Sequence, residues 1–447
     1  FVPTSFGYLP IIVFEKYIKT VNNKADFKNS GKNKMIRDNY LDMNKIIQDK
    51  KVLKLFRVVE SHGGALRFVG GAVRDALAGL KGFDLDLATD LSPDELVEAC
   101  SENGLRTVPI GIKFGTVGVI INDKVLEVTS LRRDVKTDGR HAVVEFTTDW
   151  EADASRRDLT INAVYADEKG NVFDYYNGIE DLEQGNVRFI GNPNHRIKED
   201  YLRILRFFRF YSLFGKGPID DKALKACVEN RDGLKTLSIE RIRDEFSKIL
   251  LTPNVGKTLK IMFDNEILGF LLAPSENFQQ LDFLIKLVDD ENIPHAAMRR
   301  LFVLYQPDEE LAENLAARLH LTRKQRESFV RWAAVKVPGE AFLDTDSRLK
   351  LIYKYGKEFC RDKMLLQSAL EMKNIPNLHA RLQEIEDAVV PIFSIRGKDI
   401  IAAGISDNRK IGATLDNLEQ LWLESNFRLT REELLNKVSE INQKATA

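Results

Sequence analysis

The chain is organised around two neighbouring stretches, which read Phe68-Val-Gly-Gly-Ala-Val-Arg-Asp75 and Phe83-Asp-Leu-Asp-Leu87. The first predicts an apolar strand that ends in a tight turn at Gly70-Gly71, where the absence of a Cβ lets the backbone approach a ligand closely. A helix that begins directly after this turn would direct backbone N–H groups at phosphate oxygens. In the second stretch polar and apolar residues alternate, so Asp84 and Asp86 share one face of a strand. Two carboxylates beside a phosphate-binding turn predict a magnesium site for phosphoryl or nucleotidyl transfer.

Each stretch alone also has an ordinary structural interpretation. A Gly-Gly pair is typical of any tight turn, and an Asp-x-Asp sequence is typical of a strand that faces water. The combination is more specific, because the glycine turn precedes the aspartate pair by a short helix and turn. In this order and spacing the motif resembles the signature of the polymerase-β-like nucleotidyltransferase superfamily.

The composition limits the class of protein. A chain of 447 residues is too long for a single core and predicts two to four domains. No apolar run approaches the roughly 18 residues of a membrane span, so we expect no transmembrane helix. Cys100, Cys227 and Cys360 fit neither a zinc pattern nor a disulfide framework, and a reducing compartment is therefore expected. Because the formal net charge is only −1, any RNA binding must use local basic patches.

Residues 1–50 are rich in Lys and Asn and start with a short apolar segment. They are interpreted as a flexible N-terminal extension, as a processed targeting remnant or as a segment foreign to the natural protein. The acidic residues Glu15, Asp26 and Asp38 argue against a transit peptide.

The periodicity of apolar residues changes near residue 191. Before that point strand-like and helix-like patterns alternate, which predicts an α/β (α+β) domain, and after it nearly all segments have helical spacing. A serine capping box predicts a helix that begins at Pro93. The expected strands are Leu66–Val69, Asp84–Leu87, Thr116–Ile121, Val125–Thr129 and Val143–Thr147. The expected later helices are Glu199–Phe214, Ser238–Leu251, Glu309–His320, Thr322–Val335, Arg348–Met372 and Leu415–Glu424. Prolines and turn residues suggest boundaries near residues 192, 274 and 376.

Two further segments follow the aspartate pair. Glu127 lies in a short alternating strand and could be a third carboxylate, either a base toward an attacking hydroxyl or a further metal ligand. The alternative is an edge-strand glutamate in water. The segment from Leu131 to Phe146, with Arg132, Asp138 and Arg140, has turn chemistry typical of a mobile loop near a site or of a plain surface hairpin.

The segment Asp153–Ala163 combines charged and polar residues with apolar ones. Polar groups at that density must be paired when they are buried. Arg157 could therefore bind triphosphate or ribose oxygens, or the segment could form an internal salt-bridge network.

The expected helix Glu199–Phe214 is the second strong feature. On a helix Asp200, Arg203 and Arg206 would lie along one side, where an acceptor and donors in fixed geometry could read a base edge. Asp200 could accept the exocyclic amine that cytosine and adenine share, and Arg203 could donate to the neighbouring ring acceptor. The alternative is an ion pair on a solvated helix.

In this order the motifs resemble those of the class II tRNA nucleotidyltransferases, the CCA-adding enzymes, which share ancestry with bacterial poly(A) polymerases. The resemblance implies a polymerase-β-like head with a small mixed sheet, at residues 51–191, followed by an all-α neck (192–273), body (274–375) and tail (376–447). It also implies template-independent addition of C, C and A to the 3′ end of tRNA by a two-metal Mg²⁺ mechanism, with CTP and ATP as substrates. The tail would contact the tRNA elbow.

The resemblance also implies roles for individual residues. Asp84 and Asp86 would hold Mg²⁺, and Gly71 and Arg74 would contact the nucleotide phosphates. Gly70, Arg157 and Asp158 would also bind the nucleotide, and the last two belong to the ribose-recognition motif. Asp200 and Arg203 would select the base, with Arg206 and Arg209 completing that face. The segment that contains Arg132, Asp138 and Arg140 is similar to the family's flexible loop, and residues 174–191 resemble the hinge between head and neck.

Three alternatives to full CCA addition follow from the same motifs. A poly(A) polymerase would carry an Arg-Arg-Phe signature, where this chain has Arg106–Gly115 instead. An enzyme that adds only part of CCA is disfavoured because the flexible loop is retained. A non-catalytic RNA-binding protein is disfavoured because both aspartates are present. The motifs look most like eukaryotic and α-proteobacterial members, so mitochondria or the cytosol are the expected compartments, with no membrane and no evident protein partner.

Overall fold

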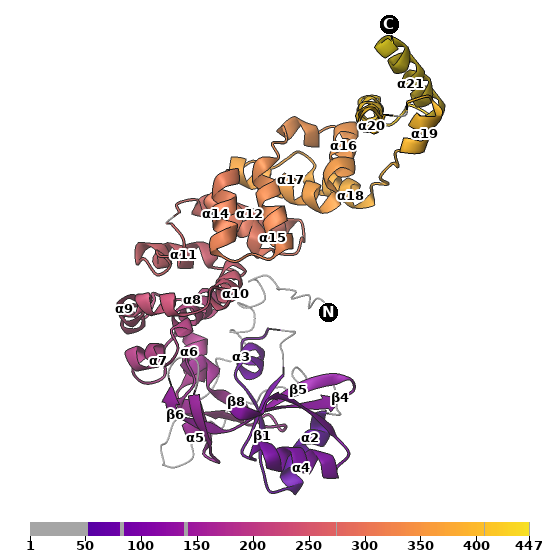
Figure 1. The fold of residues 1–447 in the computed structure, drawn as a ribbon. Helices are drawn as coiled ribbons and strands as arrows, with labels where there is room; N and C mark the ends of the chain where they lie inside the picture. The colour runs from indigo at the N-terminus through magenta and orange to yellow at the C-terminus, as the bar shows by residue number, and fades with distance from the viewer. Residues whose placement is uncertain (1–51, 81–84, 138–141, 274, 406, 447) are drawn as a thin grey trace. The chain divides into compact units, whose positions relative to one another are not determined.

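The computed structural model describes residues 52–80, 85–137, 142–273, 275–405 and 407–446 (Figure 1). The chain divides into two compact units between Pro274 and Ser275. The finer division into head, neck, body and tail stays a prediction.

A seven-stranded mixed sheet forms the centre of the first unit, in the order β3-β4-β5-β2-β1-β8-β9. Only β2 and β5 pair in parallel, and the other neighbours are antiparallel. The strands are β1 (Leu66–Val69), β2 (Asp86–Thr89), β3 (Arg106–Gly111), β4 (Thr116–Ile121), β5 (Lys124–Ser130), β8 (Val164–Ala166) and β9 (Val172–Asp174). The prediction of a mixed sheet in this part of the chain is confirmed.

Helices α2 (Val52–Ser61) and α4 (Pro93–Glu102) cover one face of this sheet (Figure 1). The core beneath them includes Phe68, Leu87 and Val128. Because side chains alternate along a strand, Asp86 and Glu127 are exposed on the opposite face. Asp86 and Glu127 therefore lie on the face away from this core. A second buried cluster, which includes Ala88, Leu131 and Tyr165, packs on that face as well.

Helix α4 begins at Pro93, as the sequence predicts. The Ser92 hydroxyl accepts a hydrogen bond from the Glu95 N–H at 3.3 Å, and the Glu95 carboxylate accepts one from the Ser92 N–H at 2.8 Å. This reciprocal capping box satisfies two backbone donors at the helix N-terminus.

The strand predictions need correction at the second strand and at β3, and strands β8 and β9 were not expected either. The second strand begins at Asp86, and Asp84 lies outside the described residues. Strand β3 was not expected, because Pro109 lies inside it. Proline cannot donate to the ladder, but β3 is at the edge of the sheet, where that loss is tolerated.

The segment after Leu131 forms a separate antiparallel pair, β6 (Arg132–Thr137) and β7 (Ala142–Phe146). The hairpin interpretation therefore holds for the described part of this segment. Strand β7 corresponds to the expected strand at Val143–Thr147, whereas β6 was not predicted as a strand. Asp138 and Arg140 lie outside the described residues.

Short helices fill the rest of the first unit. They are α3 (Gly71–Leu77), α5 (Trp150–Ser155), α6 (Gly178–Gln184), α7 (Pro193–Glu199), α8 (Leu202–Phe214), α9 (Asp221–Glu229), α10 (Ile239–Leu250) and α11 (Val255–Asp264). Helix α8 packs against α10 and α11. The single helix expected over Glu199–Phe214 is wrong at its start, because Asp200 has an extended backbone and its carboxylate accepts the Leu202 N–H at 3.1 Å. This local hydrogen bond lies between the end of α7 and the beginning of α8, so the two are separate helices.

The second unit consists of helices in the part that the structure describes. They are α12 (Phe278–Asp290), α13 (Ala297–Tyr305), α14 (Glu309–Arg318), α15 (Arg323–Ala334), α16 (Thr345–Tyr355), α17 (Lys357–Glu371), α18 (Leu378–Asp387), α19 (Gly397–Ala402), α20 (Asn408–Glu424) and α21 (Arg431–Thr446). The single helix expected over Arg348–Met372 is interrupted at Gly356, whose φ of +86° suits glycine. Across the described ranges, no helix is both long enough and apolar enough to span a bilayer.

Gly178→Ala is expected to destabilise the first unit. A Cβ on Gly178 would lie 2.2 Å from the Thr160 carbonyl oxygen and 2.8 Å from its carbon, so backbone would have to move. Overpacking of this kind costs about 1–3 kcal/mol, which urea unfolding measures. Gly217→Ala is the matched control, because a Cβ there meets no atom within 4 Å. Equal stability of the two variants would contradict the tight contact between Gly178 and Thr160.

Candidate functional site

The turn at Gly70-Gly71 brings two arginines and a carboxylate together. Strand β1 ends at Val69, Gly70 has a φ of +62°, and α3 begins at Gly71. A Cβ on Gly70 would lie 3.5 Å from Arg157 Nη1. A Cβ on Gly71 would lie 3.7 Å from Arg74 Nη2 and 4.0 Å from Asp86 Oδ2. Glycine therefore leaves the space beside these three charged groups open to a ligand.

The carboxylates lie on adjacent strands. Asp86 opens β2 and is the register partner of Glu127 on the parallel strand β5. Both side chains are exposed. Strand β5 lies between β4 and β2, so the interpretation of Glu127 as an edge-strand residue is wrong.

Hard carboxylate oxygens beside a phosphate-binding turn fit a divalent cation. Asp86 supplies such oxygens next to Gly71, and its register partner Glu127 supplies them from the adjacent strand. Asp84 is two residues from Asp86 in the sequence. Within the described ranges, which omit Asp84, no group of three or more His, Cys, Asp or Glu side chains is close enough to hold a metal ion. The donor chemistry of Asp86 and Glu127 thus fits the expected Mg²⁺.

Arg74 is buried and connects the turn to the polar segment before β8. Its Nη1 donates to Asn162 Oδ1 at 2.5 Å, and its Nε donates to Asp75 at 2.8 Å. Its guanidinium also lies over the ring of Phe210 on α8, at 4.7 Å from the centroid. Arg74 is therefore held in one orientation at the turn.

Asp158 joins this network from the other side. One carboxylate oxygen accepts from Asn162 Nδ2 at 3.0 Å, and the other accepts from Arg206 Nε at 2.6 Å. Burial would raise the pKa of Asp158, but Arg206 and Asn162 outweigh burial and hold it well below the ordinary value. An internal salt-bridge network thus exists here, and it connects α8 to the segment before β8 and to α3.

A second carboxylate, Asp153 on α5, binds the two arginines that follow it. Its Oδ1 accepts from Arg156 Nε at 2.8 Å and Nη2 at 2.6 Å, and its Oδ2 accepts from Arg157 Nη2 at 3.1 Å. Oδ2 also accepts from the Tyr165 hydroxyl at 2.8 Å. The sequence segment was recognised as charged, but Asp153 itself was not predicted as its centre.

Asp153 is expected to make stability sensitive to acid. Burial raises its pKa, but Arg157 and Arg156 outweigh burial and lower it to about 2. The unfolded value is about 3.9, so the stabilisation is complete above about pH 4 and is lost as the pH falls toward the folded pKa. This pKa shift corresponds to about 2 kcal/mol in the free energy of unfolding. When Asp153→Asn is unfolded in urea, its loss of stability in acid should therefore be smaller than that of the wild type by this amount.

The control for the acid experiment is Asp123→Asn, at an exposed position. It should keep the wild-type acid dependence. If Asp153→Asn also kept that dependence, the carboxylate would not be ion-paired as described.

The predicted base-reading residues come from α8 and the residues before it. Asp200 pairs with Arg241 on α10, with Oδ2 at 2.8 Å from Nη2, and not with Arg203. Arg203 donates to Glu199, to the Arg196 carbonyl at 3.0 Å and to the Arg156 carbonyl at 3.1 Å. Because Asp200 precedes α8, the expected single helical side that carries Asp200, Arg203 and Arg206 is wrong.

Arg206 and Arg209 both lie on α8. Arg206 pairs with Asp158 as described, and Arg209 Nε lies 2.8 Å from Glu245 Oε1 on α10. The Arg209 guanidinium is also 4.5 Å from the Phe210 ring centroid. The sequence indicated these arginines but not their partners.

Of the expected loop residues, only Arg132 is described. Its side chain donates to the Phe114 carbonyl, and its backbone N–H donates to Asp153 Oδ1 at 3.4 Å. The start of β6 is thereby connected to α5.

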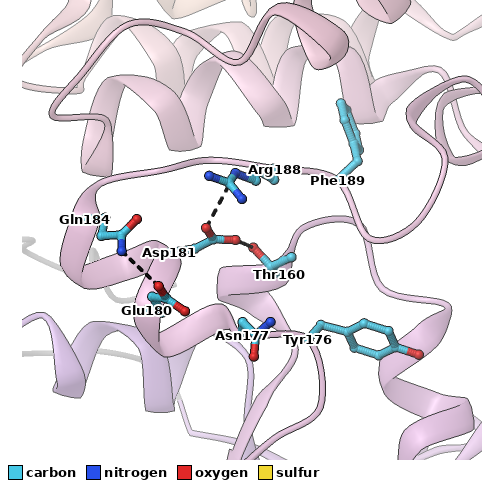
Figure 2. Close-up of a pocket in the computed structure, with 8 residues that line it drawn as sticks. All are labelled: Thr160, Tyr176, Asn177, Glu180, Asp181, Gln184, Arg188 and Phe189. Carbon is cyan, nitrogen blue, oxygen red and sulfur yellow. Dashed lines mark hydrogen bonds and ion pairs between the residues drawn. The ribbon is translucent and has the colours of Figure 1, made fainter.

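A polar pocket of about 210 Å³ lies in the segment that resembles the hinge (Figure 2). Asp181 is its buried carboxylate and accepts from the Thr160 hydroxyl at 2.7 Å, with Arg188 Nε 3.6 Å away. Burial raises the pKa of Asp181 although Thr160 and Arg188 act against it. The remaining lining residues are Tyr176, Asn177, Glu180, Gln184 and Phe189.

The amino-acid sequence of this chain is similar to those of known proteins. Residues 66–188 match the family model of the poly A polymerase head domain, and residues 218–276 match that of the probable RNA and SrmB-binding site of polymerase A. The mitochondrial CCA tRNA nucleotidyltransferase 1 of Homo sapiens is 36% identical over 396 residues, which cover 87% of this chain and 89% of the human protein. The chain belongs to the CCA tRNA nucleotidyltransferase family.

Solved structures agree with the fold of this family. The CCA-adding enzyme of Bacillus stearothermophilus in complex with CTP has a TM-score of 0.74 and 24% identity, and the match covers 90% of this chain and 98% of the other. The CCA-adding enzyme of Thermotoga maritima complexed with tRNA has a TM-score of 0.58 and 22% identity, over 89% and 98%. The prediction of a CCA tRNA nucleotidyltransferase is confirmed, and the poly(A) polymerase and binding-only alternatives are not favoured.

Proposed function

We propose that this chain adds C, C and A to the 3′ end of tRNA from CTP and ATP without a nucleic-acid template, and that pyrophosphate is released at each step. Family membership supports the activity. The position of Asp86 is the observation that supports placing the reaction at the Gly70-Gly71 turn. Asp86 is exposed beside Gly71 and is in register with Glu127.

Asp84 and Asp86 would hold Mg²⁺ in a two-metal arrangement. When bound, the metal neutralises the triphosphate and activates the terminal 3′-hydroxyl of the tRNA. Glu127 is the candidate to accept the proton of that hydroxyl or to serve as a further ligand. Its exposure on the same face as Asp86 supports this role.

The nucleotide would lie between the turn and α8. Gly70 and Gly71 leave room for the phosphates, and Arg74 and Arg157 supply positive charge beside them. Asp158 would orient the ribose, and Asp200 and Arg203 would read the base. Arg206 and Arg209 would complete the base-reading side of α8, where Arg206 pairs with Asp158 and Arg209 pairs with Glu245.

The tail would contact the tRNA elbow. Arg396, Lys398, Arg409 and Lys410 are exposed there and offer charge to phosphates. Arg132, at the start of β6, belongs with Asp138 and Arg140 to the segment that resembles the family's flexible loop, which we propose to act near the site. The human relative is mitochondrial by name, and we expect the mitochondrion for this chain.

The test is incubation of the purified protein with Mg²⁺ and tRNA that lacks CCA. CTP alone should give two added nucleotides, and CTP with ATP should give three. UTP or GTP should give no extension. Homopolymeric A tails on arbitrary RNA, or no extension at all, would contradict the proposal.

A further inference from the structure

Asp153 is the most connected side chain in the polar region of the first unit. It is 1% exposed and comes from α5, outside the glycine turn and the base-reading segment. Its two oxygens accept hydrogen bonds from Arg156, Arg157, Tyr165 and the backbone of Arg132. A carboxylate with this many donors fixes the positions of all its partners.

The consequence is clearest for Arg157. Its Nη2 donates to Asp153 at 3.1 Å, and its Nε donates to the Tyr165 hydroxyl at 3.1 Å. Since the guanidinium is planar, these two bonds determine the direction of Nη1. Nη1 faces the turn, 3.5 Å from the position of a Cβ on Gly70.

Asp153 also reaches two other parts of the site. Arg156, which it binds through two hydrogen bonds, offers its carbonyl to Arg203 Nη2 at 3.1 Å. The Arg132 N–H, at the first residue of β6, donates to Asp153 Oδ1 at 3.4 Å. One buried carboxylate therefore links the phosphate turn, the hairpin β6–β7 and the start of α8.

We propose that Asp153 is a positioning residue for nucleotide binding, which holds Arg157 toward the triphosphate at the Gly70-Gly71 turn and ties that arginine to Arg156 and β6. The proposal rests on the proposed function, because it assumes that a nucleoside triphosphate binds at this turn. Asp153 itself does not contact the substrate. Its effect passes through Arg157.

The experiment compares Asp153→Asn with the wild type in steady-state kinetics and in calorimetric titration with CTP. The amide keeps the shape but loses the charge and one acceptor, so Arg157 should no longer be held over the turn. We expect KM for CTP and ATP, and Kd for CTP, to rise between roughly 10-fold and 100-fold, with a smaller change in kcat. Tyr165→Phe removes only the hydroxyl partner and should shift the same constants in the same direction by less.

A double-mutant cycle with Arg157→Ala identifies the route of the effect. If Asp153 acts through Arg157, Asp153→Asn should add little to the loss already caused by Arg157→Ala. Full additivity would overturn the proposal. If Asp153→Asn does not fold, unchanged KM and Kd in Tyr165→Phe would overturn it as well.

The matched control is Asp362→Asn, which removes a buried carboxylate 3.3 Å from Arg299 in the second unit. It should lower stability without changing KM or Kd for CTP. An equal rise in both variants would mean that Asp153 has only a structural role and would overturn the proposal. Failure of the proposed function is distinguishable, because the wild type would then neither extend tRNA nor bind CTP.

Discussion

Asp86→Asn is expected to reduce nucleotide incorporation by about 10³-fold, because it would remove the charge of a proposed metal ligand. Loss of metal stabilisation costs several kcal/mol in the transition state, and each 1.36 kcal/mol is about tenfold in rate. Asp86 is exposed, so the fold should tolerate the amide. Single-turnover extension of tRNA that lacks CCA measures the effect, and tRNA affinity should change little. Asp84→Ala should behave in the same way.

Glu127→Gln is the comparison that distinguishes the roles of the carboxylates. Glu127 is the register partner of Asp86 and is equally exposed. If Glu127 is a base, the amide should lower the rate by about 10²-fold and alter its pH dependence. If Glu127 is only solvated, the rate should not change. Equal loss of tRNA binding and incorporation in Asp86→Asn would mean that Asp86 is structural.

The sheet strands that carry the site could be predicted because their local patterns agree with the tertiary fold. Alternation in Thr116–Ile121 and Val125–Thr129 matches β4 and β5, and residues of both strands, such as Val119 and Val128, join the core that α2 and α4 cover. Helix α4 could be predicted because its capping box lies within four consecutive residues. Strand β3 could not, because Pro109 is acceptable only at a sheet edge and the sequence does not show which strand is the edge.

The pairing of the charged residues could not be predicted, because it depends on contacts between distant segments. Arg206 binds Asp158, and Arg241 binds Asp200, across 48 and 41 positions of sequence. Sequence spacing suggested instead a local pair between Asp200 and Arg203. Asp153 had a visible signal, since a helical carboxylate three and four residues before two arginines is placed to bind both. The hydrogen bond between Asp153 and Tyr165 could not be predicted, because only the folded chain brings the two residues together.

Arg203→Ala is expected to relax nucleotide selection more than it reduces stability. Cytosine and adenine both present an amine donor beside a ring acceptor, whereas uracil and guanine present the reverse order. A carboxylate with a neighbouring guanidinium matches the first pattern, and each good pair of contacts contributes about 1–3 kcal/mol of discrimination. The preference for CTP and ATP over UTP and GTP should therefore fall between roughly 5-fold and 150-fold in competition assays.

Both proposed base-reading residues are held by neighbouring groups. Arg203 is fixed by Glu199 and by two backbone carbonyls, and Asp200 is fixed by Arg241. Arg203→Lys keeps the charge but loses the planar fork, so it should also relax selection. Arg231→Ala, which removes an ion pair with Glu266, should leave selection unchanged. Selection that survives in Arg203→Ala would show that the base is read elsewhere, whereas relaxed selection in Arg231→Ala would point to a general loosening of the helices.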